Sequence, residues 1–92
     1  MSMPDYSKQR DDLYTRVVEG ETVILDRQQN LIHQLNSTAT YVWERCDGNT
    51  SLLRIATQLA EAFDVPQEIA TRDLMMLIQQ FHDLHLLVYN SE

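Results

Sequence analysis

A metal site is the first chemistry to consider, because His82 and His85 lie three residues apart in the sequence. Side chains three positions apart share one face of a helix, and imidazole is a common zinc ligand. A second pair of ligands is missing, however, and His85 falls where the expected helix ends. We therefore interpret both histidines as solvated or helix-terminus residues, and we expect no bound metal.

The single cysteine, Cys46, is the other candidate for chemistry, since a thiolate is a nucleophile. That role needs an adjacent base and a lowered pKa, whereas the neighbouring Asp47 would raise the pKa of the thiol. A buried, unpaired cysteine is the simpler interpretation. The hydroxyls of Ser37, Thr38 and Thr40 crowd an expected helix start, where they are typical of caps. Both glycines fall at turns, so there is no phosphate-binding loop. We expect a protein that is not an enzyme and has no cofactor.

The composition indicates one small acidic domain. The chain has 92 residues, with 7 basic and 14 acidic side chains and a formal net charge of -7. A surface of that sign repels phosphate backbones and favours a basic partner. No segment resembles an export signal or a membrane span, so we expect a cytoplasmic protein. The polar segment 1–12 is expected to be a flexible lead-in to a domain over 13–92.

Three short strand-like segments follow, at 13–18, 22–26 and 31–36. They are rich in β-branched and apolar residues, and turn-forming residues separate them. Side chains alternate between the two faces of a strand, so Ile24 and Ile32 point away from their neighbours in each strand. His33 alternates with leucines, and we expect it to be half-buried rather than a catalytic base. Asn30 can adopt the left-handed backbone conformation that ends a short hairpin loop. Together the segments predict an antiparallel meander.

Three helices of roughly 10, 13 and 19 residues are expected after the strands. Each has an apolar stripe at helical spacing and a recognisable start. The expected starts are a cap at Asn36 or Ser37, a cap at Thr50 or Ser51, and Pro66 in a first turn; the expected stops are Asp47–Gly48, Asp64–Val65 and about Leu84. The stripes are Ala39, Val42, Trp43 and Cys46; Leu52, Ile55, Ala56, Leu59 and Phe63; and Ala70, Leu74, Leu77, Ile78 and Phe81. The apolar end, residues 84–89, is expected to return to the core of this α+β domain.

The third helix carries apolar residues beyond its stripe, namely Ile69, Met75 and Met76. A helix that is apolar over more than its core face either lies deep in the protein or offers a docking surface. Methionine suits adaptable contact surfaces because its side chain is unbranched and polarizable. Both interpretations, a wider core stripe and a docking surface, remain open at this point.

The segment ETVILDRQQNLIHQLNSTATYVWERCDGNTSLLRIATQLAEAFDVP resembles the PqqD family, the peptide-chaperone domains now grouped as recognition elements for precursors of ribosomally synthesised, post-translationally modified peptides (RiPPs). The resemblance covers about residues 13–88. The matching features are a strand ending in Asp26, a strand ending in Leu35–Asn36, an aromatic Trp43 before Asp47–Gly48, and the Ser51–Ile55 and Phe63–Val65 segments. Asn30 and His85 stand where the family often has glycine. Both residue types tolerate positive φ better than most.

The resemblance implies a winged-helix-like domain that binds the leader segment of a precursor peptide. The leader would add as an antiparallel strand to the edge of the third strand, beside the third helix, and would be presented to a modifying enzyme. That enzyme would be a radical S-adenosylmethionine (SAM) protein, a cyclase or a leader peptidase. An edge strand has unpaired backbone groups that bind an extended peptide, and neighbouring pockets select its side chains.

The expected groove lies between the third strand and the off-core side of the third helix. Its apolar members would receive apolar leader side chains, while Asp73 or Asp83 could pair with a leader lysine or arginine. The expected peptide-binding residues are Leu31, Ile32, His33, Gln34, Leu35, Asp73, Met76, Leu77, Gln80, Phe81 and Leu84.

Two other functions are considered as alternatives to peptide binding, and each would require different features of the sequence. A winged-helix DNA-binding regulator needs a basic recognition helix, but the third expected helix has Arg72 as its one basic residue apart from histidine. A structural subunit of a larger enzyme would need no peptide groove. We expect no nucleic-acid or membrane partner. An exposed edge strand can also pair with a second copy of the chain, which would give a homodimer.

Overall fold

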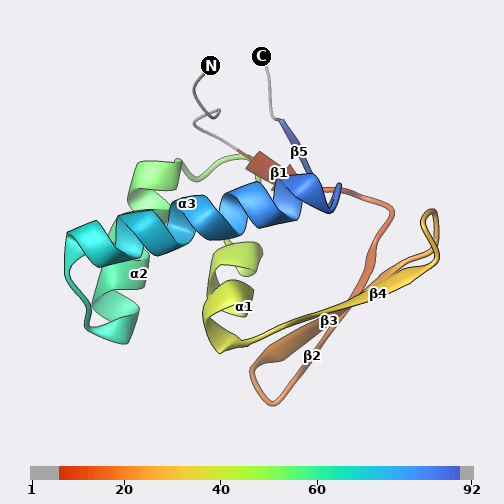
Figure 1. Ribbon diagram of the computed structural model, residues 1–92, viewed down its shortest axis with the longest axis horizontal. Helices are drawn as coiled ribbons and strands as arrows, with labels where there is room; N and C mark the ends of the chain where they lie inside the picture. Colours follow the sequence, from red (N-terminus) through yellow and green to blue (C-terminus); the bar gives the residue numbers. More distant parts are fainter. Residues whose placement is uncertain (1–6, 90–92) are drawn as a thin grey trace.

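The computed structural model describes residues 7–89, which form a three-stranded antiparallel sheet, a two-stranded sheet and three helices. The elements in chain order are β1 (Ser7–Gln9), β2 (Tyr14–Val18), β3 (Glu21–Asp26), β4 (Leu31–Leu35), α1 (Ser37–Glu44), α2 (Leu52–Phe63), α3 (Gln67–Asp83) and β5 (Leu87–Tyr89). In Figure 1 the β2–β3–β4 ribbon extends from the start of α1, and α3 crosses the molecule beside it. The predicted α+β class, antiparallel meander and three helices are confirmed.

The meander is built by two hairpins whose turns use positive φ. Glu19 and Gly20, at φ 52° and 82°, connect β2 to β3, as a two-residue hairpin favours. Asn30, at φ 58°, ends the loop between β3 and β4, as predicted. In the register of β3 and β4, Ile24 lies opposite His33, and Ile32 lies opposite Leu25. The two isoleucines therefore point to opposite faces of the sheet, and only Ile24 faces the core, where it is fully buried.

Side-chain caps start the first two helices. The Asn36 side chain accepts a hydrogen bond from the Ala39 amide at 2.9 Å, and the Ser51 side chain accepts one from the Arg54 amide at 3.1 Å. These contacts resolve the two open choices of cap. Pro66 was expected inside the first turn of α3, but it is the residue just before the helix and makes no side-chain cap. Its fixed φ and missing amide hydrogen suit either position.

Thr40 corrects the prediction that the hydroxyls at the start of α1 act as caps. Its side chain is buried and accepts hydrogen bonds from the Thr22 amide at 3.0 Å and from the Thr22 hydroxyl at 2.9 Å. The contact joins β3 to α1 across 18 residues of sequence, where local patterning carries no signal. It fixes the helix against the sheet directly beside β4.

The core is a single cluster between the sheet and the helices. Its largest side chains are Trp43 and Phe81, whose rings meet edge to face with centroids 5.4 Å apart. All four stripe residues predicted for α1 are buried. Two predicted stripe residues are not: Phe63 is exposed, with its ring edge to face against Tyr41, and Leu77 is only half-buried. Phe63 is the last residue of α2, and Leu77 packs against the core cluster from its margin.

Residues 7–9 belong to the segment expected to be a flexible lead-in, and the structure places them in a strand. Strand β1 pairs antiparallel with β5, and Ser7 is buried. The Ser7 hydroxyl lies 3.2 Å from Nε2 of His82. Leu86 and Leu87 are buried, so the predicted return of the C-terminal segment to the core is confirmed. Residues 10–12 of the predicted lead-in are also described and connect β1 to β2, with Arg10 paired to Asp26, while residues 1–6 fall outside the described residues. Within residues 7–89, no helix has the length and apolarity to cross a membrane.

Candidate functional site

Strand β4 lies at an edge of the three-stranded sheet, because the strand order is β2–β3–β4. The C-terminal strand β5 pairs with β1 in the other sheet and not with β4. Among residues 7–89, therefore, no strand pairs with the outer edge of β4. The backbone N–H and C=O groups along that edge are free to pair with an extended chain.

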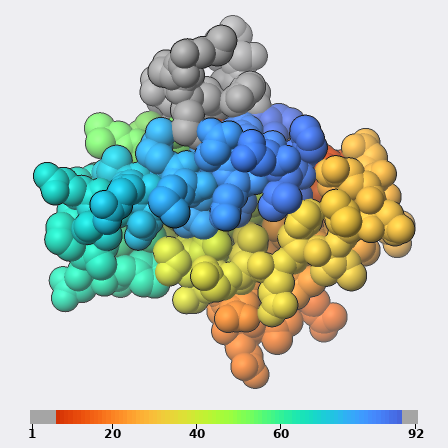
Figure 2. Space-filling model, in the orientation of Figure 1, coloured from red at the N-terminus to blue at the C-terminus, as the bar shows by residue number. Residues whose placement is uncertain are grey.

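A groove of about 530 Å³ runs between this edge and α3. Figure 2 shows the segment around β4 directly beside α3 on one face of the molecule. The floor is apolar, with Leu35 and Phe81 both buried, while Ile32 and Leu84 are exposed on the walls. The lining residues are Ile32, His33, Gln34, Leu35, Asn36, Ala39, Leu77, Gln80, Phe81, Asp83 and Leu84.

A smaller hollow of about 170 Å³ continues the groove toward the start of α3. It shares Asn36, Leu77 and Gln80 with the main groove. Its other lining residues are Thr38, Asp73 and Met76. Met76 is 61% exposed and Met75 is 37% exposed, so neither widens the core stripe. Of the two interpretations of these methionines, the structure supports an accessible surface, with Met76 at the groove.

The strand and the helix that form the groove run in opposite directions (Figure 1). At one end, the Gln29 side chain donates a hydrogen bond to the Leu84 carbonyl at 3.3 Å, which places the start of β4 beside the end of α3. At the other end, Asn36 lines the same hollow as Asp73. A strand added antiparallel to β4 would therefore run in the same direction as α3.

The structure gathers ten of the eleven expected site residues around these two hollows. Eight line the main groove, and Asp73 and Met76 line the smaller one. Leu31 lines neither hollow; it is exposed at the start of β4, opposite Asp26. Sequence reasoning left out Asn36, Thr38 and Ala39, which lie just after β4. Their position directly after an edge strand was a usable signal, but their small or polar side chains suggested only a helix start.

His33 lines the groove, and one of its ring nitrogens lacks a hydrogen-bond partner among the described residues. The side chain is half-buried, as predicted, and its Nε2 atom is buried with no hydrogen-bond partner among the described residues. A buried polar nitrogen without a partner is costly, so a ligand group that reached it would relieve that cost.

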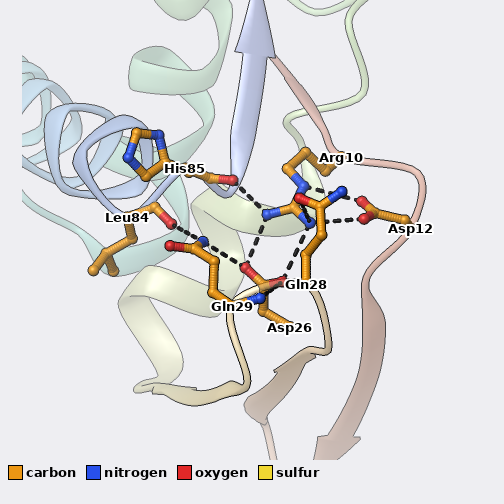
Figure 3. Close-up of polar contacts among 7 residues, drawn as sticks. All are labelled: Arg10, Asp12, Asp26, Gln28, Gln29, Leu84 and His85. Carbon is orange, nitrogen blue, oxygen red and sulfur yellow. Dashed lines mark hydrogen bonds and ion pairs between the residues drawn. The ribbon is translucent and has the colours of Figure 1, made fainter.

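A polar network holds one end of the groove in place (Figure 3). Arg10 forms an ion pair with the fully buried Asp26 at 2.8 Å and also donates to the His85 carbonyl at 2.9 Å. Asp26 accepts further hydrogen bonds from the Gln29 amide at 3.2 Å and from its side chain at 2.7 Å. Gln29 in turn reaches Leu84. The segment before β2, the β3–β4 loop and the end of α3 are thereby joined, which fixes the spacing of β4 and α3.

Acid is expected to weaken this network. Hydrogen bonding from Arg10, the largest effect, together with hydrogen bonds from Gln29, lowers the pKa of Asp26 to about 2. An unfolded aspartate has a pKa of about 3.9. Because the folded value is the lower one, the stabilisation is fully present above about pH 5 and is lost as pH falls toward about 2.

Urea unfolding at a series of pH values measures this effect. We expect the Asp26→Asn variant to show a smaller loss of stability than the wild type between pH 5 and pH 2. Asp11→Asn is the control, because Asp11 is exposed and its one ion pair within residues 7–89 is with Lys8 at 3.4 Å. Equal acid sensitivity in the wild type and Asp26→Asn would contradict the assignment.

The residues considered for chemistry are not arranged as a reactive centre. Cys46 is buried, and burial, with a smaller contribution from Asp47, raises its pKa to about 12. The thiol is therefore protonated at neutral pH. His85 has left the helix at φ 61°, while His82 lies near Ser7 and burial lowers its pKa. Within residues 7–89, no group of three or more His, Cys, Asp or Glu residues could hold a metal ion.

A family comparison decides which proteins this chain is related to. The model of the PqqD family, described as coenzyme PQQ synthesis protein D, matches residues 21–87. The chain belongs to the PqqD family. The matched residues contain β3, β4, all three helices and the start of β5, so they include both walls of the groove. A comparison with curated protein sequences gives no match.

Solved structures with the same fold include two leader-peptide complexes. TbiB1 in complex with the TbiA(β) leader peptide is 18% identical, with a TM-score of 0.82 over 92% of this chain and 99% of that chain. Lasso peptide synthetase B1 complexed with the leader peptide is 22% identical, with a TM-score of 0.79 over 89% and 96%. The PqqD truncation of Methylobacterium extorquens PqqCD, described as a functional and stand-alone RiPP recognition element, is 19% identical, with a TM-score of 0.72 over 89% and 87%. These matches give no support to the DNA-binding alternative.

Proposed function

We propose that this PqqD-family domain binds the leader segment of a ribosomally made precursor peptide and presents it to a modifying enzyme or leader peptidase. The edge of β4, which no strand within residues 7–89 covers, beside a groove with an apolar floor carries the proposal. The leader adds as an antiparallel strand to β4, and its alternate side chains point into the groove against α3. Two solved proteins of the same fold are complexes with leader peptides.

The binding energy in this scheme has two sources. Backbone hydrogen bonds to β4 hold any extended peptide and do not depend on its side chains. Selectivity comes from apolar side chains that enter the groove over Leu35 and Phe81, with Met76 as an adaptable contact. The domain itself carries out no reaction, needs no cofactor and works in the cytoplasm. The chemistry belongs to its partner, a radical SAM enzyme, a cyclase or a leader peptidase.

An NMR titration tests the proposal. The purified ¹⁵N-labelled protein is titrated with a synthetic leader from the precursor gene nearest its own. We expect amide shifts concentrated in 31–38 and along the groove side of α3, and a dissociation constant well below about 1 mM. A scrambled leader of identical composition is the control. Shifts confined to α2 or to the outer face of the sheet, or no saturation at millimolar peptide, would overturn it.

A further inference from the structure

The charged side chains that line the groove are acidic at both ends. Asp83 lines the main groove and Asp73 lines the smaller hollow, and no lysine or arginine among the described residues 7–89 lines either one. Neither carboxylate forms an ion pair within residues 7–89. Asp83 accepts a hydrogen bond from the neutral Gln79 side chain at 2.9 Å and has no lysine or arginine within ion-pair distance among residues 7–89. The groove therefore offers two negative charges with an apolar floor between them.

The distance between the two carboxylates can be compared with the repeat of a β-strand. Asp73 and Asp83 are ten residues apart in α3, and a rise of 1.5 Å per residue separates them by about 15 Å along the axis. An extended chain advances about 3.4 Å per residue, so four residues span about 14 Å. Side chains four residues apart also point to the same face of a strand. The residue midway between them points to that face as well.

We propose that the peptide bound in this groove carries a five-residue segment of the form basic-x-apolar-x-basic. The first basic side chain pairs with Asp73, the apolar one enters the groove over Leu77 and Phe81, and the second basic side chain pairs with Asp83. This order follows from a strand antiparallel to β4, which runs in the direction of α3. The segment has the same length as β4, five residues. The inference rests on the proposed function and adds to it the chemistry of the ligand.

Fluorescence anisotropy with designed peptides tests the charge pattern. Two labelled nine-residue peptides are compared, each built of threonine and valine around a central leucine. The first peptide carries a lysine two residues before and two residues after the leucine. The second peptide carries glutamate at these two positions. At low salt, we expect the lysine peptide to bind about tenfold more tightly, because two ion pairs replace two repulsions. The preference should shrink in 1 M salt, where the screening length is about 3 Å.

Charge reversal tests the direction of the peptide. The Asp83→Lys variant should bind the lysine peptide more weakly than the wild type does. A peptide that keeps lysine at its first charged position and carries glutamate at its second should regain that affinity. A peptide with glutamate at the first position should not, because that side chain faces Asp73. Asp73→Lys should show the opposite pattern, so the variants form a double-mutant cycle. Glu61→Lys is the matched control: it changes the net charge equally, but Glu61 is exposed on α2 and lines no part of the groove.

The outcomes separate this inference from the proposed function. Equal binding of the lysine and glutamate peptides, or equal effects of Asp83→Lys and Glu61→Lys, would overturn the charge pattern. A natural leader that binds along β4 without a basic pair would also overturn it, and the proposed function would stand. Failure of the natural leader to shift β4 or α3 amides would instead overturn the proposed function.

Discussion

Replacement of Trp43 by alanine is expected to lower the free energy of unfolding by about 3–5 kcal/mol, as large-to-small aromatic changes in cores do. The Trp43 side chain is 2% exposed and packs edge to face on Phe81. A domain of this size has a total stability of about 5–14 kcal/mol, so the variant would lose a large part of it. Urea unfolding followed by circular dichroism measures the loss.

Leu53→Ala is the matched control for this variant. Leu53 is an apolar side chain on α2 that is 73% exposed, and its truncation should change stability by less than about 0.5 kcal/mol. Because Phe81 also lines the groove floor, the Trp43→Ala variant should lose leader binding together with its fold. A Trp43→Ala variant within about 1 kcal/mol of the wild type would show that the ring is not a core anchor.

Replacement of Gln80 by tryptophan is expected to block the groove and leave the fold intact. Gln80 is exposed and lines both hollows, so a larger side chain there occupies the space proposed for the leader. Loss of one well-packed anchor contact costs about 2 kcal/mol, which weakens leader binding about thirtyfold. Isothermal titration calorimetry with the leader peptide measures the change.

Met75→Trp is the control for the blocked groove. Met75 is also exposed on α3 but lines neither hollow, since five helix positions place it about 140° around the helix from Gln80. Thermal unfolding should show that both variants fold as the wild type does. If Gln80→Trp and Met75→Trp bind the leader equally well, the peptide does not lie between β4 and α3.

Much of the fold was predictable because its signals are local. The Asn36 and Ser51 caps, the positive φ of Asn30 and the α1 stripe around Trp43 each depend on residues within about one helical turn. The features that sequence reasoning missed are non-local. Strand β1 has a polar sequence and forms only because residues 80 positions away supply its partner β5.

The candidate groove was predictable in outline for a different reason. The strand pattern and the family resemblance together placed an edge strand beside the third helix, and ten of the eleven expected residues line the two hollows. Leu31 shows the limit of that reasoning. Its alternation with His33 and Leu35 placed it on their face, but Leu31 is exposed at the start of β4 and lines neither hollow.

The sequence by itself determined the three strands of the meander, the three helices, the side-chain caps and the acidic character of the protein, since these depend on neighbouring residues and on composition. Only the tertiary structure decided that no strand within residues 7–89 pairs with the outer edge of β4 and that α3 runs opposite to β4. It also decided that Asp73 and Asp83 are the charges at the two ends of the groove. The physical reason is that each of these properties depends on contacts between segments far apart in the chain, such as Arg10 with Asp26 and Gln29 with Leu84.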